Sequence, residues 1–181
     1  MAAATDLLRA ADSGFSLEAT AKAAGVTRLT VYNQFGSRRA LLEAVFDDRA
    51  ARGGLHRIAA AMSDPDPHTG LDRLITIFCD FWSLDPGTLA RLHAAVALDA
   101  EFAESLHLRN ERRHRALSVL VGRMAGATTD VHQASDLTDV LFTLTSFAVF
   151  ADLTSGTRSP ADACALIHAL ATDAVRRFGL Y

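Results

Sequence analysis

The spacing of the apolar residues is the feature that most restricts how this chain folds. Between residues 71 and 82 they recur at i, i+3, i+4 and i+7, the spacing that places side chains on one face of an α-helix. The members of this stripe are Leu71, Leu74, Ile75, Phe78, Cys79 and Trp82. Similar stripes run through most of the sequence, and the period-two alternation of a half-buried strand is absent. We therefore predict an all-α protein.

Composition places the chain among folded proteins of a reducing compartment. Half of its 181 residues are hydrophobic and 22% are charged, which is typical of a globular chain. The N-terminus lacks the basic and apolar segments of a signal peptide, and no apolar run reaches the roughly 18 residues of a membrane span. We expect a cytoplasmic protein with no membrane segment. Because Cys79 and Cys164 form no CxxC pair, we expect neither a disulfide framework nor a metal site, and no cofactor.

Basic residues gather in one acid-free stretch, although the formal net charge is −3. Between Glu18 and Glu43 there are no acidic residues, but there are four basic ones: Lys22, Arg28, Arg38 and Arg39. Such a run is either an ordinary solvated face or the electrostatic footprint of a polyanion. The choice between the two depends on the motif in the same stretch.

Residues 16–35 carry the signals of two short helices joined by a tight turn. Ser16 is expected to cap a helix over residues 17–24, and Gly25 to end it with a positive φ. Thr27 is expected to cap a second helix over residues 28–35. Two helices with so short a connection form a helix-turn-helix.

The second of these helices is rich in polar side chains. Val31 and Phe35 are four positions apart and are expected to face inward, which leaves the polar residues outward. Arginine pairs with guanine, asparagine and glutamine pair with adenine, and threonine or tyrosine hydroxyls reach phosphates. A third helix is expected to open at Ser37, where Arg38 and Arg39 oppose the helix dipole and a DNA phosphate would compensate them. The predicted DNA-binding residues are Thr27, Arg28, Leu29, Thr30, Tyr32, Asn33, Gln34, Ser37 and Arg38.

The stretch "AAGVTRLTVYNQFGSRRALLEAV" resembles the DNA-binding region of the TetR/AcrR family of bacterial transcriptional repressors. The matching positions are Ala21, Ala24, Gly25, Val26, Thr27, Thr30, Val31, Tyr32, Phe35, Ser37, Arg38, Leu41 and Leu42. The match covers about 30 residues. Two features depart from the family pattern: the first helix is short, with Leu7, Leu8 and Ala11 as its apolar face, and Thr20 stands where an aliphatic residue is usual.

This resemblance implies a two-domain organisation and a function. A helix-turn-helix DNA-binding domain is expected over residues 1–52, and a larger helical domain for effector binding and dimerisation over residues 53–181. The resemblance implies a homodimeric repressor of double-stranded operator DNA. A small, mostly apolar ligand in the C-terminal domain would release it from the operator.

The C-terminal sequence has the character of an interface. From Leu137 to Leu153 it is apolar nearly all round, so a helix there must be buried on two sides. Ser159-Pro160 opens a last helix with a long apolar stripe containing small residues. We predict a dimer interface formed by the last two helices, over about 132–153 and 160–178. The alternative is a monomeric bundle with a central helix.

Candidate pocket residues are the large apolar groups of the helical domain, together with one inward histidine. They are Phe78, Phe81, Trp82, His93, Phe102, Met124, Phe142 and Phe147. Arg113 and His114 also fall at inward positions, where polar groups need partners. A ligand, a neighbouring subunit or Asp80 would serve.

The alternatives to a DNA-binding regulator are an enzyme and a helical interaction module. Seven histidines invite an enzyme, but the sequence lacks HExxH, GxSxG, a phosphate-binding glycine loop and a paired-carboxylate motif, so we predict no catalytic residues. A helical interaction module without DNA would explain the bundle. It would leave the polar helix and the basic run unexplained, and failure to bind DNA at low salt would favour it.

Overall fold

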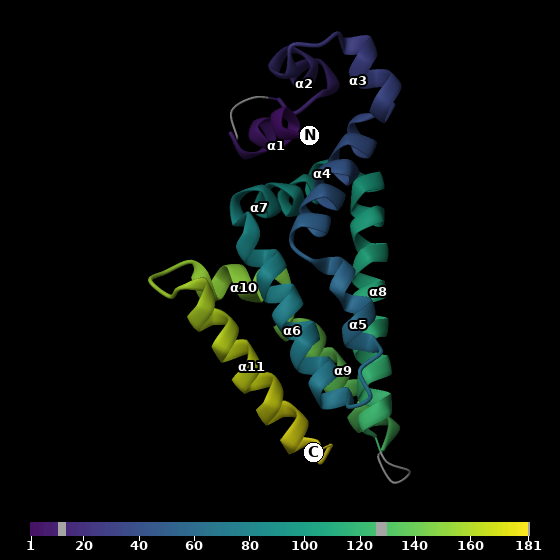
Figure 1. Cartoon of the computed structure of the whole chain (residues 1–181), viewed down its shortest axis with the longest axis vertical. Helices are drawn as coiled ribbons and strands as arrows, with labels where there is room; N and C mark the ends of the chain where they lie inside the picture. Colours follow the sequence, from purple (N-terminus) through teal and green to yellow (C-terminus); the bar gives the residue numbers. More distant parts are fainter. Residues whose placement is uncertain (11–13, 126–129, 181) are drawn as a thin grey trace. The chain divides into compact units, whose positions relative to one another are not determined.

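The computed structural model describes residues 1–10, 14–125 and 130–180, and every regular element in these ranges is a helix (Figure 1). The predicted all-α class is confirmed. The chain divides into two compact units. The first unit comprises residues 1–52 and 84–108, and the second comprises residues 53–83 and 109–181.

The first unit is built around a small apolar core shared by all its longer helices. Its helix α1 packs against α2, α4 and α7, while α3 packs against α2 and α4. The buried residues include Leu8, Ala21, Val31, Leu41, Leu42, Val45, Phe46, Leu89, Leu92 and Phe102. The elements are α1 (Ala2–Arg9), α2 (Leu17–Ala24), α3 (Arg28–Phe35), α4 (Arg38–Arg52), α7 (Pro86–Ala95), the 3-10 turn η2 (Val96–Leu98) and α8 (Ala100–Met124) up to Leu108.

The first helix is short, as its sequence predicts. Leu8 is buried and Leu7 is half-buried, while Ala11 lies outside the described residues. Thr20, where the family pattern has an aliphatic residue, is buried on α2. Its hydroxyl has no hydrogen-bond partner among the described residues, which makes this a less favourable packing position than an aliphatic side chain would be.

A buried carboxylate joins three helices of the first unit. Asp85 caps α7 by accepting from the backbone N–H and the hydroxyl of Thr88, at 3.2 and 2.8 Å. Its Oδ2 lies 2.7 Å from Nη2 of Arg9 on α1 and 3.4 Å from Nη1 of Arg49 on α4. Burial disfavours the ionised form, but the hydrogen bonds from Arg9 and Thr88 outweigh it and hold the pKa of Asp85 below its usual value. The charge is therefore retained in the core.

The packing groups residues 84–108 with the N-terminal helices. A boundary between the units follows Arg52, where the sequence places the end of the DNA-binding domain, but α7 contacts α1 and α4. The contacts of Asp85 help to hold α7 against these helices, and they join positions far apart in the sequence. Whether residues 1–52 and 53–181 fold as separate domains stays a prediction.

The second unit is a group of helices that encloses a core rich in aromatic residues. Its last helix packs against the two that precede it. The fully buried side chains include Phe81, Leu117, Leu120, Leu137, Leu141 and Phe150. The elements are the 3-10 turn η1 (Leu55–Arg57), α5 (Ile58–Met62), α6 (Pro67–Leu84) up to Ser83, α8 from Arg109, α9 (Val131–Leu144), α10 (Phe147–Thr154) and α11 (Pro160–Arg177).

The predicted continuous helix over residues 137–153 is wrong, because it breaks at Thr145 and Ser146. Ser146 has an extended backbone and its hydroxyl accepts from the N–H of Val149, so it caps a new helix, α10. α9 and α10 are bent by 49° at this break. Within the described ranges, no single helix is long and apolar enough to cross a membrane, although this bent pair passes the same test when taken together.

Cys79 and Cys164 meet in the second unit, although they are distant in sequence. They lie on α6 and α11, both thiols are free, and their side chains hydrogen-bond to each other. Burial and this hydrogen bond raise the pKa of Cys79 above its usual value, and burial raises that of Cys164. Such thiols are poor nucleophiles.

Removing the Asp85 carboxylate is expected to destabilise the first unit strongly. Asp85→Ala removes the buried carboxylate that Arg9 and Arg49 share and leaves α7 without its cap. We expect the free energy of unfolding, measured by urea denaturation, to fall by about 3 kcal/mol. Asp80→Ala is the matched control, because Asp80 forms an exposed ion pair with Arg57 at 2.6 Å, and its loss should cost under about 1 kcal/mol.

Acid should abolish the same difference. Since the pKa of Asp85 is lowered in the fold, its contribution is present above the unfolded pKa of about 3.9 and is lost as the pH falls through the lower folded value. The wild type and Asp85→Ala should therefore converge in stability below pH 4. Equal costs of the two alanine substitutions at neutral pH would contradict the role given to Asp85.

Candidate functional site

The turn between α2 and α3 has the geometry that the sequence predicts. The hydroxyl of Ser16 accepts from the N–H of Ala19 at 3.1 Å and caps α2. Gly25 has a φ of 67°, and its N–H donates to the carbonyl of Lys22, while the N–H of Val26 donates to that of Ala21. These two bonds form a Schellman motif, which ends α2 and reverses the chain within two residues. The start of α3 is thereby placed close to the end of α2.

Local hydrogen bonds and one buried side chain determine which face of α3 is outward. The hydroxyl of Thr27 accepts from the N–H of Thr30 at 3.1 Å and lies 2.8 Å from the hydroxyl of Thr30. Val31 is 4% exposed and is the buried residue of α3, while Phe35 is half-buried. The predicted inward face is therefore the observed one.

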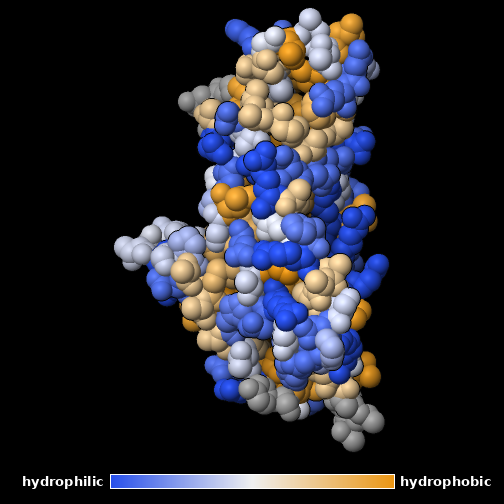
Figure 2. Space-filling view, in the orientation of Figure 1, coloured by the Kyte–Doolittle hydropathy of each residue, from blue (hydrophilic) through white to orange (hydrophobic). Residues whose placement is uncertain are grey.

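The opposite face of α3 presents the predicted contact residues to the surface. Leu29 is 65% exposed and Tyr32 is 54% exposed. In Figure 2, hydrophobic and hydrophilic groups are intermingled over the region of α2 and α3. Such a mixed surface suits the edges of base pairs, which offer both hydrogen-bonding groups and thymine methyls. The exposed side chains on α3 and its cap are Thr27, Arg28, Leu29, Thr30, Tyr32, Asn33 and Gln34.

The residues at the start of α4 are engaged within the first unit. Ser37 is exposed, but its hydroxyl accepts from the N–H of Ala40 and caps α4. Arg38 donates from Nε to the carbonyl of Phe15 at 3.1 Å and from Nη1 to Asp99 at 2.9 Å. From the sequence, a DNA phosphate is expected to compensate these cations. In the structure, a carboxylate compensates Arg38.

Arg39 follows the same pattern. Its guanidinium lies 3.1 Å from Glu101 and 3.7 Å from Glu43. Two of the four cations in the acid-free stretch are thus paired with acids about 60 positions further along the chain. Lys22 and Arg28 are exposed and form no ion pair within the described ranges. Sequence reasoning missed Asp99 and Glu101 because no local signal connects them to the helix-turn-helix.

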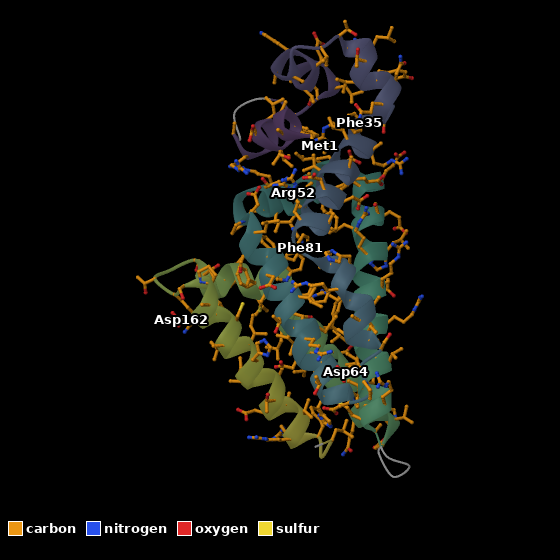
Figure 3. The ribbon with its side chains drawn as sticks, viewed as in Figure 1. Met1, Phe35, Arg52, Asp64, Phe81 and Asp162 are labelled. Carbon is orange, nitrogen blue, oxygen red and sulfur yellow. The ribbon has the colours of Figure 1, made fainter. Side chains whose placement is uncertain are left out.

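Five of the eight predicted pocket residues meet in the second unit. Trp82 is at the centre of this group, which we call the aromatic cluster. Its ring centroid lies 4.4 Å from that of Phe81, which Figure 3 marks, and 5.5 and 6.0 Å from those of Phe147 and Phe78. Phe142 joins the cluster through Arg113, whose guanidinium lies 4.1 Å from the Phe142 ring centroid and 5.7 Å from that of Phe78.

The other three candidates lie elsewhere. His93 and Phe102 belong to the first unit, where Phe102 is fully buried and Nδ1 of His93 lies 2.9 Å from the carbonyl oxygen of Leu89. Met124 is half-buried at the end of α8. The place of these three residues in a pocket stays a prediction.

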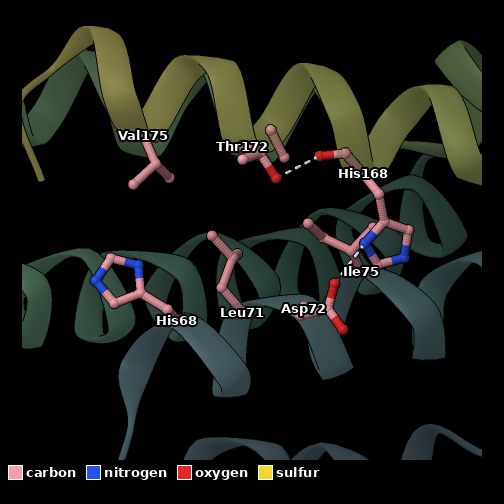
Figure 4. Close-up of a pocket in the computed structure, with 8 residues that line it drawn as sticks. His68, Leu71, Asp72, Ile75, His168, Thr172 and Val175 are labelled. Atoms are coloured by element: carbon pink, nitrogen blue, oxygen red, sulfur yellow. Dashed lines mark hydrogen bonds and ion pairs between the residues drawn. The ribbon is translucent and has the colours of Figure 1, made fainter. Parts of the chain in front are cut away.

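Two hollows in the second unit are lined by other residues. One, of about 150 Å³, lies between α6 and α11 (Figure 4), with Leu71, Ile75 and Val175 among its apolar lining and Asp72 beside His168. Nδ1 of His168 is 2.8 Å from Asp72, so this pair closes one end of the hollow. The second, of about 270 Å³, lies between α5 and α6. Both are smaller than the 300–1,000 Å³ typical of ligand pockets.

A metal centre finds no support in the part of the chain that the structure describes. No group of three histidine, cysteine, aspartate or glutamate side chains is arranged there to hold an ion.

Comparison with known proteins connects this geometry with a family. Residues 1–45 match the family model described as bacterial regulatory proteins, tetR family. Among solved structures, a TetR-like transcriptional regulator from Rhodococcus sp. RHA1 matches with a TM-score of 0.72 and 21% sequence identity, over 97% of this chain and 92% of that one. At this identity the likeness concerns the fold. No curated protein matches the chain significantly.

The positive φ of Gly25 should make the turn sensitive to any side chain. Gly25→Ala places a Cβ in open space, so its cost is conformational, and we expect the free energy of unfolding to fall by about 1 kcal/mol. Gly122→Ala is the control, because Gly122 lies in α8 with open space around it and no positive φ. It should raise stability by up to about 1 kcal/mol. Changes of the same sign in urea denaturation would contradict this account of the turn.

Proposed function

We propose that this chain, whose residues 1–45 match the model of the tetR family of bacterial regulatory proteins, is a DNA-binding transcriptional regulator and acts as a ligand-released repressor. In this proposal two copies bind double-stranded operator DNA through α3. A small, mostly apolar molecule bound in the second unit releases them. The chain would act in the cytoplasm, where the DNA is, and we assign it no catalytic residues, metal or cofactor.

The exposed polar face of α3 is the observation that supports this function best. Arg28 has the donors to pair with guanine, and Asn33 and Gln34 have the donor and acceptor to pair with adenine. Tyr32 is suited to a phosphate oxygen, and Thr27 and Thr30 to phosphate or a thymine methyl. Val31 is the only buried residue of α3, so the polar side chains of this helix are free to contact a partner. Their hydrogen-bonding groups match those that DNA offers.

Ser37 and Arg38 take a positioning role in the proposal. Arg38 holds the loop before α2 through the carbonyl of Phe15 and the η2–α8 connection through Asp99. The guanidinium also lies 5.8 Å from the ring centroid of Phe15. α4 is thereby tied to the loop that precedes α2, and so to the start of the helix-turn-helix. Contact of Ser37 or Arg38 with a phosphate would come in addition to these bonds.

Dimerisation would follow from the apolar surface of the last helices. α11 turns Ala163, Ile167, Ala171 and Val175 toward its own chain, whereas Leu170 is 42% exposed. Val140 on α9 is 38% exposed. A second copy would cover these positions, with the interface now formed by α9, α10 and α11. The two α3 helices must then fit half-sites about 34–36 Å apart, or a multiple of that distance.

Ligand release requires that the effector binds one of two arrangements of the dimer more tightly. The aromatic cluster would offer a small apolar molecule the faces and edges of several rings to pack against. A ligand that separated them would move α6 and α10, which carry Trp82 and Phe147.

Substitutions on α3 test the DNA-binding surface. A DNA sequence is first selected from a random double-stranded pool with the wild type, and affinities are then measured by fluorescence anisotropy. Arg28→Ala and Tyr32→Ala should each weaken binding about tenfold, since each removes a base or phosphate contact. Arg91→Ala, an exposed arginine on α7, should bind as the wild type does.

The salt dependence provides a second readout. Wild-type affinity should fall steeply with salt, because phosphate contacts release counterions. Unchanged binding by both α3 variants, with wild-type dimer mass, would reject α3 as the DNA-binding helix. Failure to enrich any DNA at low salt would favour the interaction module instead.

A charge at the proposed interface should separate the subunits. Leu170→Glu is expected to shift the molar mass, measured by light scattering after size exclusion, from twice the chain mass of 19.4 kDa to the single value, because it would bury an unpaired carboxylate. Leu108→Glu, at a leucine 50% exposed on α8, should leave the mass unchanged. A single-chain mass for the wild type would refute the dimer.

A further inference from the structure

Arg113 is a buried cation with no acidic partner among the described residues. It lies in the middle of α8 and is only 8% exposed. Nη1 donates to the hydroxyl of Thr145 at 3.2 Å, and Nη2 lies 3.5 Å from the side-chain oxygen of Asn110. Within the described ranges, no aspartate or glutamate lies at ion-pair distance from it. Burying a charge against neutral oxygens alone is unfavourable, so the position requires an explanation.

One edge of this guanidinium is available to an acceptor. Nε is buried and has no hydrogen-bond partner among the described residues, and Nη2 on the same edge makes only the long contact with Asn110. This is the edge through which arginine binds a carboxylate with two parallel N–H···O bonds. Burial lowers the pKa of Arg113 to about 10, so the group stays protonated at neutral pH.

Two acids of the second unit are paired with other residues. Asp80, which the sequence offered as a partner, lies 2.6 Å from Arg57. Asp139, one turn before Thr143 on α9, lies 3.0 Å from Nε2 of His114. Among the described residues, the structure therefore offers Arg113 no acidic partner.

The surroundings of Arg113 define what kind of anion would fit. The guanidinium lies over the rings of Phe142 and Phe78, and Phe78 stacks on Trp82 with their ring centroids 6.0 Å apart. A doubly charged phosphate would need more than one cation among these rings. A single carboxylate on an apolar body matches one guanidinium bordered by aromatic side chains.

We propose that Arg113 binds the carboxylate of an amphipathic monocarboxylic acid whose apolar body lies against the aromatic cluster. The inference rests on the proposed function, of which it names the effector class. It also assigns a route for the signal. Arg113 and Trp82 both hydrogen-bond to Thr145 at the break between α9 and α10. Trp82 does so through its Nε1–H at 3.0 Å. An acid that binds Arg113 acts on the residue where these two helices bend.

The test compares acids with their neutral amides on the full-length protein. The probes are 4-phenylbutanoate with 4-phenylbutanamide and octanoate with octanamide, and the readouts are the thermal unfolding midpoint and calorimetric titration. At least one acid should raise the midpoint of the wild type and bind it at least tenfold more tightly than its amide does. Equal effects of acid and amide, or no binding by either acid, would overturn the proposal.

Variants identify the guanidinium as the cause. Arg113→Met should abolish the preference for the acid, and Arg113→Lys, which keeps the charge without the two-donor edge, should retain only part of it. Arg112→Met is the matched control, because it removes the exposed neighbour on the same helix and should behave as the wild type. A preference that persists in both Arg113 variants would place the anion site elsewhere.

The ligand-free variant separates a binding role from a structural one. If Arg113 is an anion-binding residue that is unpaired without its ligand, Arg113→Met should unfold at the wild-type midpoint or above it, because an apolar side chain replaces an unpaired charge. A large drop, together with equal binding of acid and amide by the wild type, would show that the arginine is structural.

DNA binding is measured in parallel so that the two proposals fail separately. Arg113→Met should bind the selected DNA as the wild type does, and only the wild type should release it when the acid is added. If the wild type binds no DNA but prefers the acid, the repressor proposal fails and the anion site stands. If it binds DNA and shows no preference, only the anion site fails.

Discussion

The charge of Asp85 is almost fully removed from water, and three helices of the first unit meet on it. Arg9 from α1 and Arg49 from α4 neutralise the carboxylate, which also caps α7. α2 packs on α1 and α3 packs on α4, so the helix-turn-helix rests on the two helices that this carboxylate joins. The orientation of α3 within the first unit therefore depends on an ion pair that lies outside the DNA-binding motif.

Asp85 and Arg113, the two charged residues that are buried in the described part of the chain, stand in opposite situations. Asp85 is surrounded by two arginines and a threonine, and its negative charge is stabilised within the fold. Arg113 has neutral oxygens and aromatic rings around it, and its Nε lacks an acceptor. A complete network of this kind holds helices together, whereas an incomplete one leaves a buried donor to which the proposed ligand would supply the acceptor.

The charge pattern of the helix-turn-helix gains a different meaning in three dimensions. In the sequence, four cations stand in a stretch without acids, which suggests a strongly positive surface. In the fold, Asp99 and Glu101 pair with Arg38 and Arg39, so part of that charge serves to position α4. The exposed face of α3 therefore presents more hydrogen-bonding side chains than charged ones. In the proposed complex with DNA, this balance would favour reading of base edges over unspecific attraction to phosphates.

The sequence by itself determined what local interactions decide. The caps at Ser16 and Thr27, the positive φ at Gly25 and the inward position of Val31 involve neighbours within four or five residues. These signals were sufficient to predict the bounds of α2 and α3 and the outward face of α3. Ser146 carried a similar cap signal, but the apolar run around it outweighed that signal in a pattern-based prediction.

Only the tertiary structure decided which distant residues meet. The pairing of Arg38 with Asp99, the position of α7 beside α1 and the gathering of the aromatic cluster around Arg113 join segments tens of residues apart. Periodicity shows that such a side chain faces inward, but it does not say what it faces. Whether a buried charge is satisfied depends on that missing partner, and for this reason the sequence left the role of Arg113 open.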